Sequence, residues 1–115
     1  MASAKNRVLD GFYKGDFIRS KGNDIYIDAG FTKININKKR FASYELLTED
    51  KVKSGTSAIL RGAVGVAILG TPGILAALTA KDKSIYLIAL EYNNGGHSLI
   101  EIDDKLYKLL VRSMF

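Results

Sequence analysis

The chain has 115 residues, enough for one domain with a modest hydrophobic core. Its apolar content of 47% and charged content of 25% exclude an intrinsically disordered chain. The net charge of +5 favours anionic partners, and the absence of cysteine excludes disulfides, thiolate metal sites and cysteine nucleophiles. The first residues, MASAKNRVLDG, contain no apolar stretch of the signal-peptide type, which predicts a cytoplasmic protein, either free or peripheral on the inner face of the membrane.

The first third of the chain has the alternation of half-buried antiparallel strands. The run 12–20 (FYKGDFIRS) is rich in aromatic and β-branched residues, and 21–24 (KGND) is typical of a hairpin turn. Residues 24–28 and 31–37 then alternate isoleucines with polar residues. We predict three strands here, with four isoleucines facing the core: Ile25, Ile27, Ile34 and Ile36.

Further strands are predicted on both sides of a glycine-rich segment. Residues 41–52 fit a strand or a helix, and the alternation of Tyr44, Leu46 and Thr48 favours a strand. The run 84–92 (SIYLIALEY) is apolar on both faces, which indicates a central strand of the sheet or one covered by helices of the glycine-rich segment. Residues 93–96 (NNGG) are typical of a tight hairpin turn that returns the chain into a last strand, 98–102. The sequence therefore predicts five or six antiparallel strands.

An amphipathic helix is predicted to close the domain. Asp103 or Asp104 is suited to cap its first turn. The helical spacing then produces an apolar stripe, with the basic residues largely off it. The stripe consists of Leu106, Leu109, Leu110 and Met114.

The glycine-rich segment, residues 54–83, interrupts the strands, and its centre, 62–80 (GAVGVAILGTPGILAALTA), contains no charged residue. In its middle, 70–73 (GTPG) combines a helix-ending glycine, a capping threonine and a proline suited to a first helical position. We predict two short helices, 57–69 and 72–80, packed through small residues as a hairpin. Its membrane or oligomer surface would include Gly62, Gly65, Val66, Leu69, Gly70, Pro72, Gly73, Ile74, Leu75 and Leu78.

Three coverings for this apolar hairpin stay open: lipid, the protein's own sheet, or another copy of the chain. A single spanning helix of about 28 Å is disfavoured, because it would separate the strands before it from those after it. Basic residues also flank both ends, so no positive-inside asymmetry supports a span. Burial of the hairpin in the core of a soluble protein and its insertion into lipid are supported equally.

This order of elements resembles the pleckstrin-homology-like (PH-like) superfamily, in particular small bacterial and phage proteins with a PH-like or GRAM-like domain interrupted by a segment like SGTSAILRGAVGVAILGTPGILAALTAKDK. The resemblance covers nearly the whole chain. It implies an α+β, mainly β fold: a bent antiparallel sheet or partial barrel with an inserted glycine-rich helical hairpin and a C-terminal amphipathic helix. Residues 1–115 would form this single domain, with 54–83 as the insertion and 103–115 as the closing helix.

In this superfamily, basic residues around the first hairpin commonly hold phosphoinositide headgroups. The densest positive cluster of this chain, residues 38–40, would join them if the loops meet at one end of the barrel. Candidate anion- or lipid-binding residues are Lys14, Arg19, Lys21, Lys38, Lys39 and Arg40. The expected partners are an anionic membrane surface, a protein segment or further copies of the chain. Nucleic acid is less favoured, because the sequence has no interleaved basic-aromatic motif, with scattered tyrosines at Tyr26, Tyr44, Tyr86 and Tyr92.

Catalytic chemistry is not predicted. His97 follows two glycines, which predicts an exposed turn histidine rather than a member of a catalytic triad or a metal site. The acidic pairs 49–50 and 103–104 are interpreted as a solvated strand end and a helix cap. No glycine precedes a Lys-Ser or Lys-Thr pair as in a phosphate loop. We therefore expect no catalytic residue, metal or cofactor.

The sequence as a whole predicts a non-enzymatic PH-like binding module. Its glycine-rich hairpin would mediate membrane association or self-association, and its basic loops would contact anionic groups. The alternative is an inhibitor or immunity-type protein, of the kind that phages and mobile elements carry, which binds one host protein.

Overall fold

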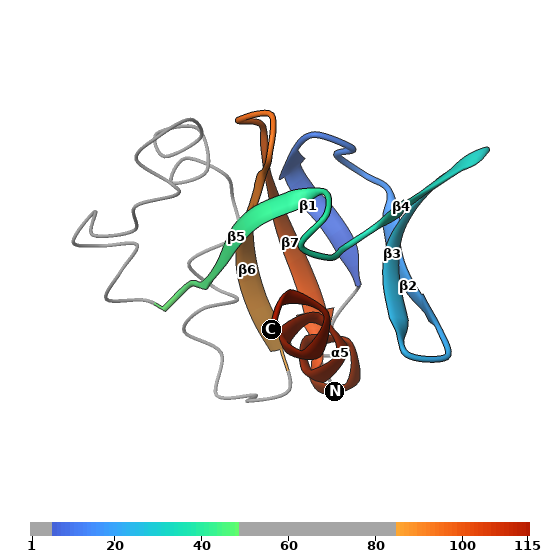
Figure 1. Cartoon of the computed structure of the whole chain (residues 1–115), viewed down its shortest axis with the longest axis vertical. Coiled ribbons are helices and arrows are strands. Elements are labelled where there is room, and N and C mark those ends of the chain that lie inside the picture. Colours follow the sequence, from blue (N-terminus) through green and yellow to red (C-terminus); the bar gives the residue numbers. More distant parts are fainter. Residues whose placement is uncertain (1–5, 49–84) are drawn as a thin grey trace.

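A computed structural model describes residues 6–48 and 85–115 of the chain. In this part, seven strands form one antiparallel sheet in the order β4-β3-β2-β1-β7-β6-β5, which curls into a half-barrel (Figure 1). One helix, α5, follows the last strand. The elements are β1 (Arg7–Gly11), β2 (Phe17–Lys21), β3 (Asp24–Ala29), β4 (Thr32–Asn35), β5 (Phe41–Leu46), β6 (Ile85–Tyr92), β7 (His97–Asp103) and α5 (Asp104–Met114).

The core lies on the concave face of the sheet. Ile18, Ile27 and Ile34 pair in one row across β2, β3 and β4, and all three are buried. Ile88 of β6 and Ile100 of β7 form a corresponding pair on the other side of the half-barrel, and neither is exposed at all. The alternation predicted for the isoleucines is thus confirmed, because each strand places every second side chain on the same face.

The closing helix covers this concave face, as its apolar stripe predicts. Leu106, Leu110 and Met114 are buried in the core cluster, and Leu109 packs partly buried against it. Asp103 is the N-cap: one carboxylate oxygen accepts the Leu106 N–H at 2.9 Å. The mainly β fold with a C-terminal amphipathic helix is therefore present.

The strand β6 is apolar on both faces, and both faces are buried. Ile88 and Leu90 point into the core cluster, whereas Leu87 and Ala89 occupy the alternate positions and are each only 2% exposed. In sheet order, β6 lies between β5 and β7. The prediction of a central strand is confirmed, whereas its alternative, cover by the inserted helices, concerns residues outside the described ranges.

The beginning of the chain differs from the predicted strand 12–20. The structure has an additional strand, β1, before it, and residues 12–15 form a turn, so that β2 starts only at Phe17. Gly11 and Gly15 both have positive φ angles, and a chain in that conformation cannot continue a regular strand. The described residues accordingly contain seven strands rather than five or six.

The glycine-rich segment 54–83, its two predicted helices and all residues assigned to its surface lie outside the described residues, as does the end of the predicted strand 41–52. Within the described ranges, no helix is both long enough and apolar enough to cross a membrane.

Candidate functional site

Three connections between strands meet at one end of the sheet. They are the β1–β2 loop, the β4–β5 connection and the β6–β7 turn; the first and the last lie together at the top of Figure 1. The Phe12 N–H donates to the His97 carbonyl at 2.9 Å, which joins the first loop to β7. The Asn93 side-chain amide donates to the Lys39 carbonyl at 2.9 Å, which joins the β6–β7 turn to the β4–β5 connection. Hydrogen bonds therefore hold all three connections in one arrangement.

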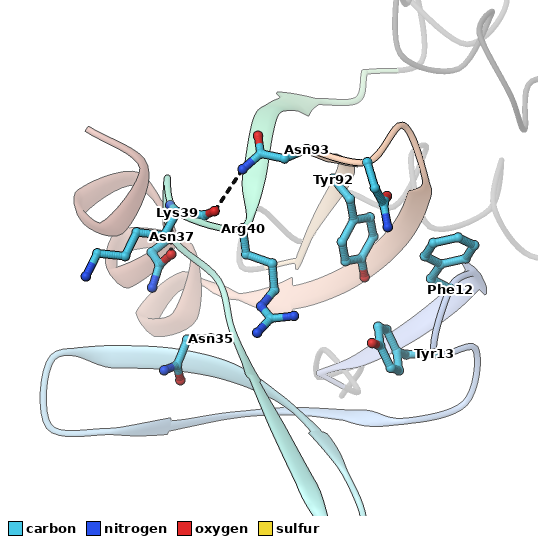
Figure 2. Close-up of a pocket in the computed structure, with 9 residues that line it drawn as sticks. Phe12, Tyr13, Asn35, Asn37, Lys39, Arg40, Tyr92 and Asn93 are labelled. Carbon is cyan, nitrogen blue, oxygen red and sulfur yellow. Dashed lines mark hydrogen bonds between the residues drawn. The ribbon is translucent and has the colours of Figure 1, made fainter.

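The three connections enclose an open cavity of about 480 Å³, within the range of small-molecule sites (Figure 2). Among the described residues, its lining contains two cations and no carboxylate. The polar part of the lining consists of Asn35, Asn37, Asn93, Asn94, Lys39 and Arg40. In Figure 2 the Arg40 guanidinium extends into the middle of the cavity, whereas the Lys39 ammonium lies farther from the aromatic side chains.

The other wall of the cavity is aromatic and consists of Phe12, Tyr13 and Tyr92. The Tyr92 ring centroid lies 5.3 Å from that of Phe12 and 6.2 Å from that of Tyr13. Tyr13 has a φ of +65°, a conformation that is uncommon for a bulky side chain and that concentrates at functional positions. Tyr92 is almost fully buried, but Phe12 and Tyr13 remain 48% and 36% exposed.

Two glycines permit the loops to approach this closely. Gly11 has a φ of +84°, and a Cβ atom there would overlap the backbone carbonyl of His97. A Cβ atom on Gly96 would overlap the Phe12 ring. Glycine at both positions therefore lets the aromatic wall form against the β6–β7 turn.

The cavity presents mostly hydrogen-bond donors. Asn37 Oδ1 already accepts the Lys39 N–H at 3.0 Å, and Asn94 Oδ1 accepts the Gly96 N–H at 2.9 Å. Within the described ranges their side-chain NH₂ groups have no hydrogen-bond acceptor, so they are left as donors in the cavity that Arg40 also lines. In the described part of the chain, neither Lys39 nor Arg40 forms an ion pair. Such a lining suits a ligand that is negatively charged and rich in acceptor oxygens.

Tyr92 at the base of the aromatic wall is expected to make stability depend on alkaline pH. Burial raises the pKa of Tyr92 to about 12, although its hydrogen bond with Ser98 and the nearby Arg40 lower it. Because the folded protein holds this proton more tightly than an unfolded tyrosine with a pKa near 10.0, the stabilisation is complete below that pH and is lost as the pH rises toward about 12. We expect the free energy of unfolding in urea to fall across this interval, and to fall less steeply in Tyr92→Phe. Equal slopes in the two proteins would contradict this assignment.

The structure places the six cations predicted from the sequence at different points. Lys39 and Arg40 line the cavity, while Lys38 lines a neighbouring hollow against β5. Arg19 lies on β2, where its Nε is 2.8 Å from Asp28 Oδ2. Lys14 lies in the β1–β2 loop, before β2 begins, and Lys21 is the last residue of β2. The two lysines are therefore near opposite ends of that strand.

No protein-family model, curated protein or solved structure matches this chain. The PH-like family assignment thus remains a prediction, and the cavity is the feature of the described structure that points to a function. The sequence did not identify the asparagines and the aromatic residues of this cavity as site residues. The only signal was the NNGG turn, which indicates a change of chain direction but not what the turn faces.

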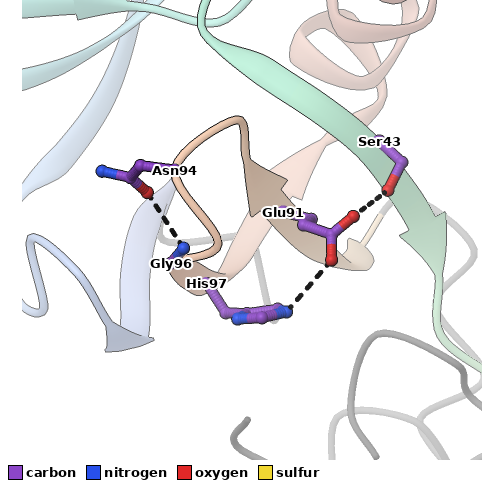
Figure 3. Close-up of polar contacts among 5 residues, drawn as sticks. All are labelled: Ser43, Glu91, Asn94, Gly96 and His97. Atoms are coloured by element: carbon purple, nitrogen blue, oxygen red, sulfur yellow. Dashed lines mark hydrogen bonds and ion pairs between the residues drawn. The ribbon is translucent and has the colours of Figure 1, made fainter. Parts of the chain in front are cut away.

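The prediction that His97 is exposed is wrong. His97 is the first residue of β7, is only 9% exposed, and pairs with Glu91 of β6. Its Nε2 lies 3.5 Å from Glu91 Oε2, while Ser43 donates to the other Glu91 oxygen at 3.1 Å (Figure 3). β7 begins one residue earlier than predicted. The additional pair, His97 with Glu91, places the imidazole in the sheet rather than in the turn.

This polar cluster does not have the arrangement of a nucleophile and its base. Ser43 bonds to Glu91 rather than to His97, so the imidazole is not placed to take the serine proton. Among the described residues, no group of three or more histidine, aspartate or glutamate side chains is suited to hold a metal ion. The cavity around Arg40 is the better candidate site.

Proposed function

We propose that the protein is a binding module that takes an anionic, oxygen-rich group into the cavity around Arg40. The observation that carries this proposal is the lining. The Arg40 guanidinium and the side-chain NH₂ groups of Asn37 and Asn94 line one space, and no described carboxylate lines it. A guanidinium forms paired, charge-assisted hydrogen bonds with phosphate or carboxylate oxygens. The net charge of +5 adds a general attraction for anions.

The shared chemistry of the ligand is a phosphate group, either on a lipid headgroup or on a free molecule. The curled antiparallel sheet with its C-terminal helix supports the proposal of a PH-like module. For the glycine-rich segment 54–83, we keep the proposal that it mediates association with a membrane or with another copy. The residues on which the anion site is argued all belong to the described part of the chain.

Replacing Arg40 with glutamine is expected to weaken phosphate binding about tenfold, the effect of losing a charge-assisted hydrogen bond. The measurement is a titration with inorganic pyrophosphate, followed through the backbone amide NMR signals of the cavity. Arg19→Gln is the matched control, because Arg19 is another exposed arginine but is paired with Asp28 away from the cavity lining. Its affinity should stay within about twofold of the parent protein.

The two sources of phosphate are separated by a second titration with vesicles of phosphatidylcholine and phosphatidylinositol phosphate. A lipid ligand predicts binding to these vesicles that Arg40→Gln weakens, and a free ligand predicts pyrophosphate binding alone. The proposal fails if neither probe binds, or if Arg40→Gln and Arg19→Gln weaken binding equally.

A further inference from the structure

The cavity has an aromatic wall that a phosphate group by itself does not use. Phe12 and Tyr13 keep substantial exposed area although they line a concave site, and Phe12 is held in place over Gly96 and beside Tyr92. Exposed rings that are fixed in a cavity lose little freedom when a flat group stacks on them. Tyr13, whose backbone is left-handed, contributes a second exposed ring to the lining of the same space.

The wall opposite these rings carries amide groups with unused hydrogen-bonding atoms. Asn35 is exposed, and its side chain forms no hydrogen bond in the described part of the chain. Asn37 lies on the same side of the cavity as Asn35 (Figure 2), and because its Oδ1 accepts the Lys39 N–H, its NH₂ group is left as a donor. Amide side chains form hydrogen bonds with the donor and acceptor groups at the edges of nucleobases, whereas a plain hydrocarbon ring has no such groups.

We infer that the ligand of this cavity is a nucleotide, a phosphate ester that carries a planar nucleobase; the inference rests on the proposed anion site. Arg40, between the two walls, takes the phosphate. The base stacks against Phe12 and Tyr13, and its edge faces the asparagines. A volume of about 480 Å³ accommodates a mononucleotide, within the usual size range of small-ligand sites.

In the sequence, the aromatic residues are scattered and form no motif typical of nucleic-acid binding. Phe12 and Tyr13 belong to one loop and Tyr92 ends a distant strand, and only the fold places all three beside Arg40. A lipid headgroup would use the cations but not the rings. The aromatic wall and the amides together therefore favour a nucleotide over an inositol phosphate.

The test compares adenosine 5′-monophosphate, ribose 5-phosphate, phenyl phosphate and inorganic phosphate by isothermal titration calorimetry on the full chain. We expect adenosine monophosphate to bind about tenfold tighter than ribose 5-phosphate, because the base adds one stacking contact. Tyr13→Ala should remove most of that preference while leaving ribose 5-phosphate affinity within about twofold. Tyr26→Ala is the matched control, since Tyr26 stands on β3 and does not line the cavity.

Asn35→Ala provides a second variant, at an exposed position where the fold is not at stake, and should lower adenosine monophosphate affinity about threefold to tenfold. Equal affinities for adenosine monophosphate and ribose 5-phosphate would overturn the nucleotide inference and leave the anion site standing. If phenyl phosphate bound as tightly as adenosine monophosphate, the nucleotide inference would also be overturned, because the cavity would then accept any aromatic phosphate. If no phosphate binds at all, the proposed function fails together with the inference.

Discussion

Replacing Gly11 with alanine is expected to lower the free energy of unfolding by about 3 kcal/mol or more. Two costs combine at this position. A φ of +84° costs a residue with a Cβ atom about 1–2 kcal/mol, and the new methyl group would overlap the His97 backbone carbonyl, which no side-chain rotation can relieve. Chemical denaturation in urea, monitored by far-UV circular dichroism, measures the change.

Gly22→Ala separates the two costs. Gly22 also has a positive φ, +62°, but nothing lies within 4 Å of a Cβ atom placed there. The Gly22→Ala variant should therefore lose only the conformational part of this free energy of unfolding, about 1 kcal/mol. Equal losses in the two variants would show that the contact between the β1–β2 loop and β7 is not as tight as the structure has it. Because the same contact positions Phe12, Gly11→Ala should also weaken ligand binding, and Gly22→Ala should not.

Replacing Leu110 with alanine is expected to cost about 2–5 kcal/mol of unfolding free energy. Leu110 is completely buried at the centre of the helix stripe, within the core cluster that α5 and the concave face of the sheet share. The truncation removes buried apolar surface and leaves a cavity that a curled sheet, closed by one helix, cannot easily fill. The midpoint of urea unfolding at constant m-value is the measurement.

Leu109→Ala is the matched control on the same helix. The substitution is chemically identical, but Leu109 is only partly buried against the core. Its cost should be well below that of Leu110→Ala, because less surface is returned to water and solvent can fill the gap. If both variants lost the same stability, the helix would not lie on the sheet with the face that the structure assigns to it.

Features that depend on neighbours in the chain were predictable from the sequence. The alternation of isoleucines from 25 to 36 identified β3, β4 and their buried face, and KGND and NNGG identified two hairpin turns. The apolar stripe and capping aspartate identified α5. Each of these signals repeats within a few residues, with the period of the element that it forms.

The position of β1 was not predictable in the same way. Its five residues, RVLDG, have little alternation, and their place in the sheet depends on pairing with β7 near the other end of the chain, where Val8 meets Ile100. Asn6 and Asp103 add hydrogen bonds to each other across the same distance in sequence. Partners so far apart leave no periodic trace in a single sequence.

The candidate site was likewise predictable from the sequence only in part. The sequence alone determined that residues 38–40 carry the densest positive charge, because charge is a property of the residues themselves, and Lys39 and Arg40 do line the cavity. Only the tertiary structure decided that Tyr13, Tyr92 and the asparagines face Arg40, and that His97 is buried beside Glu91. These side chains come from three connections whose meeting depends on sheet curvature, strand register and two close glycine contacts, all of which act between distant parts of the chain.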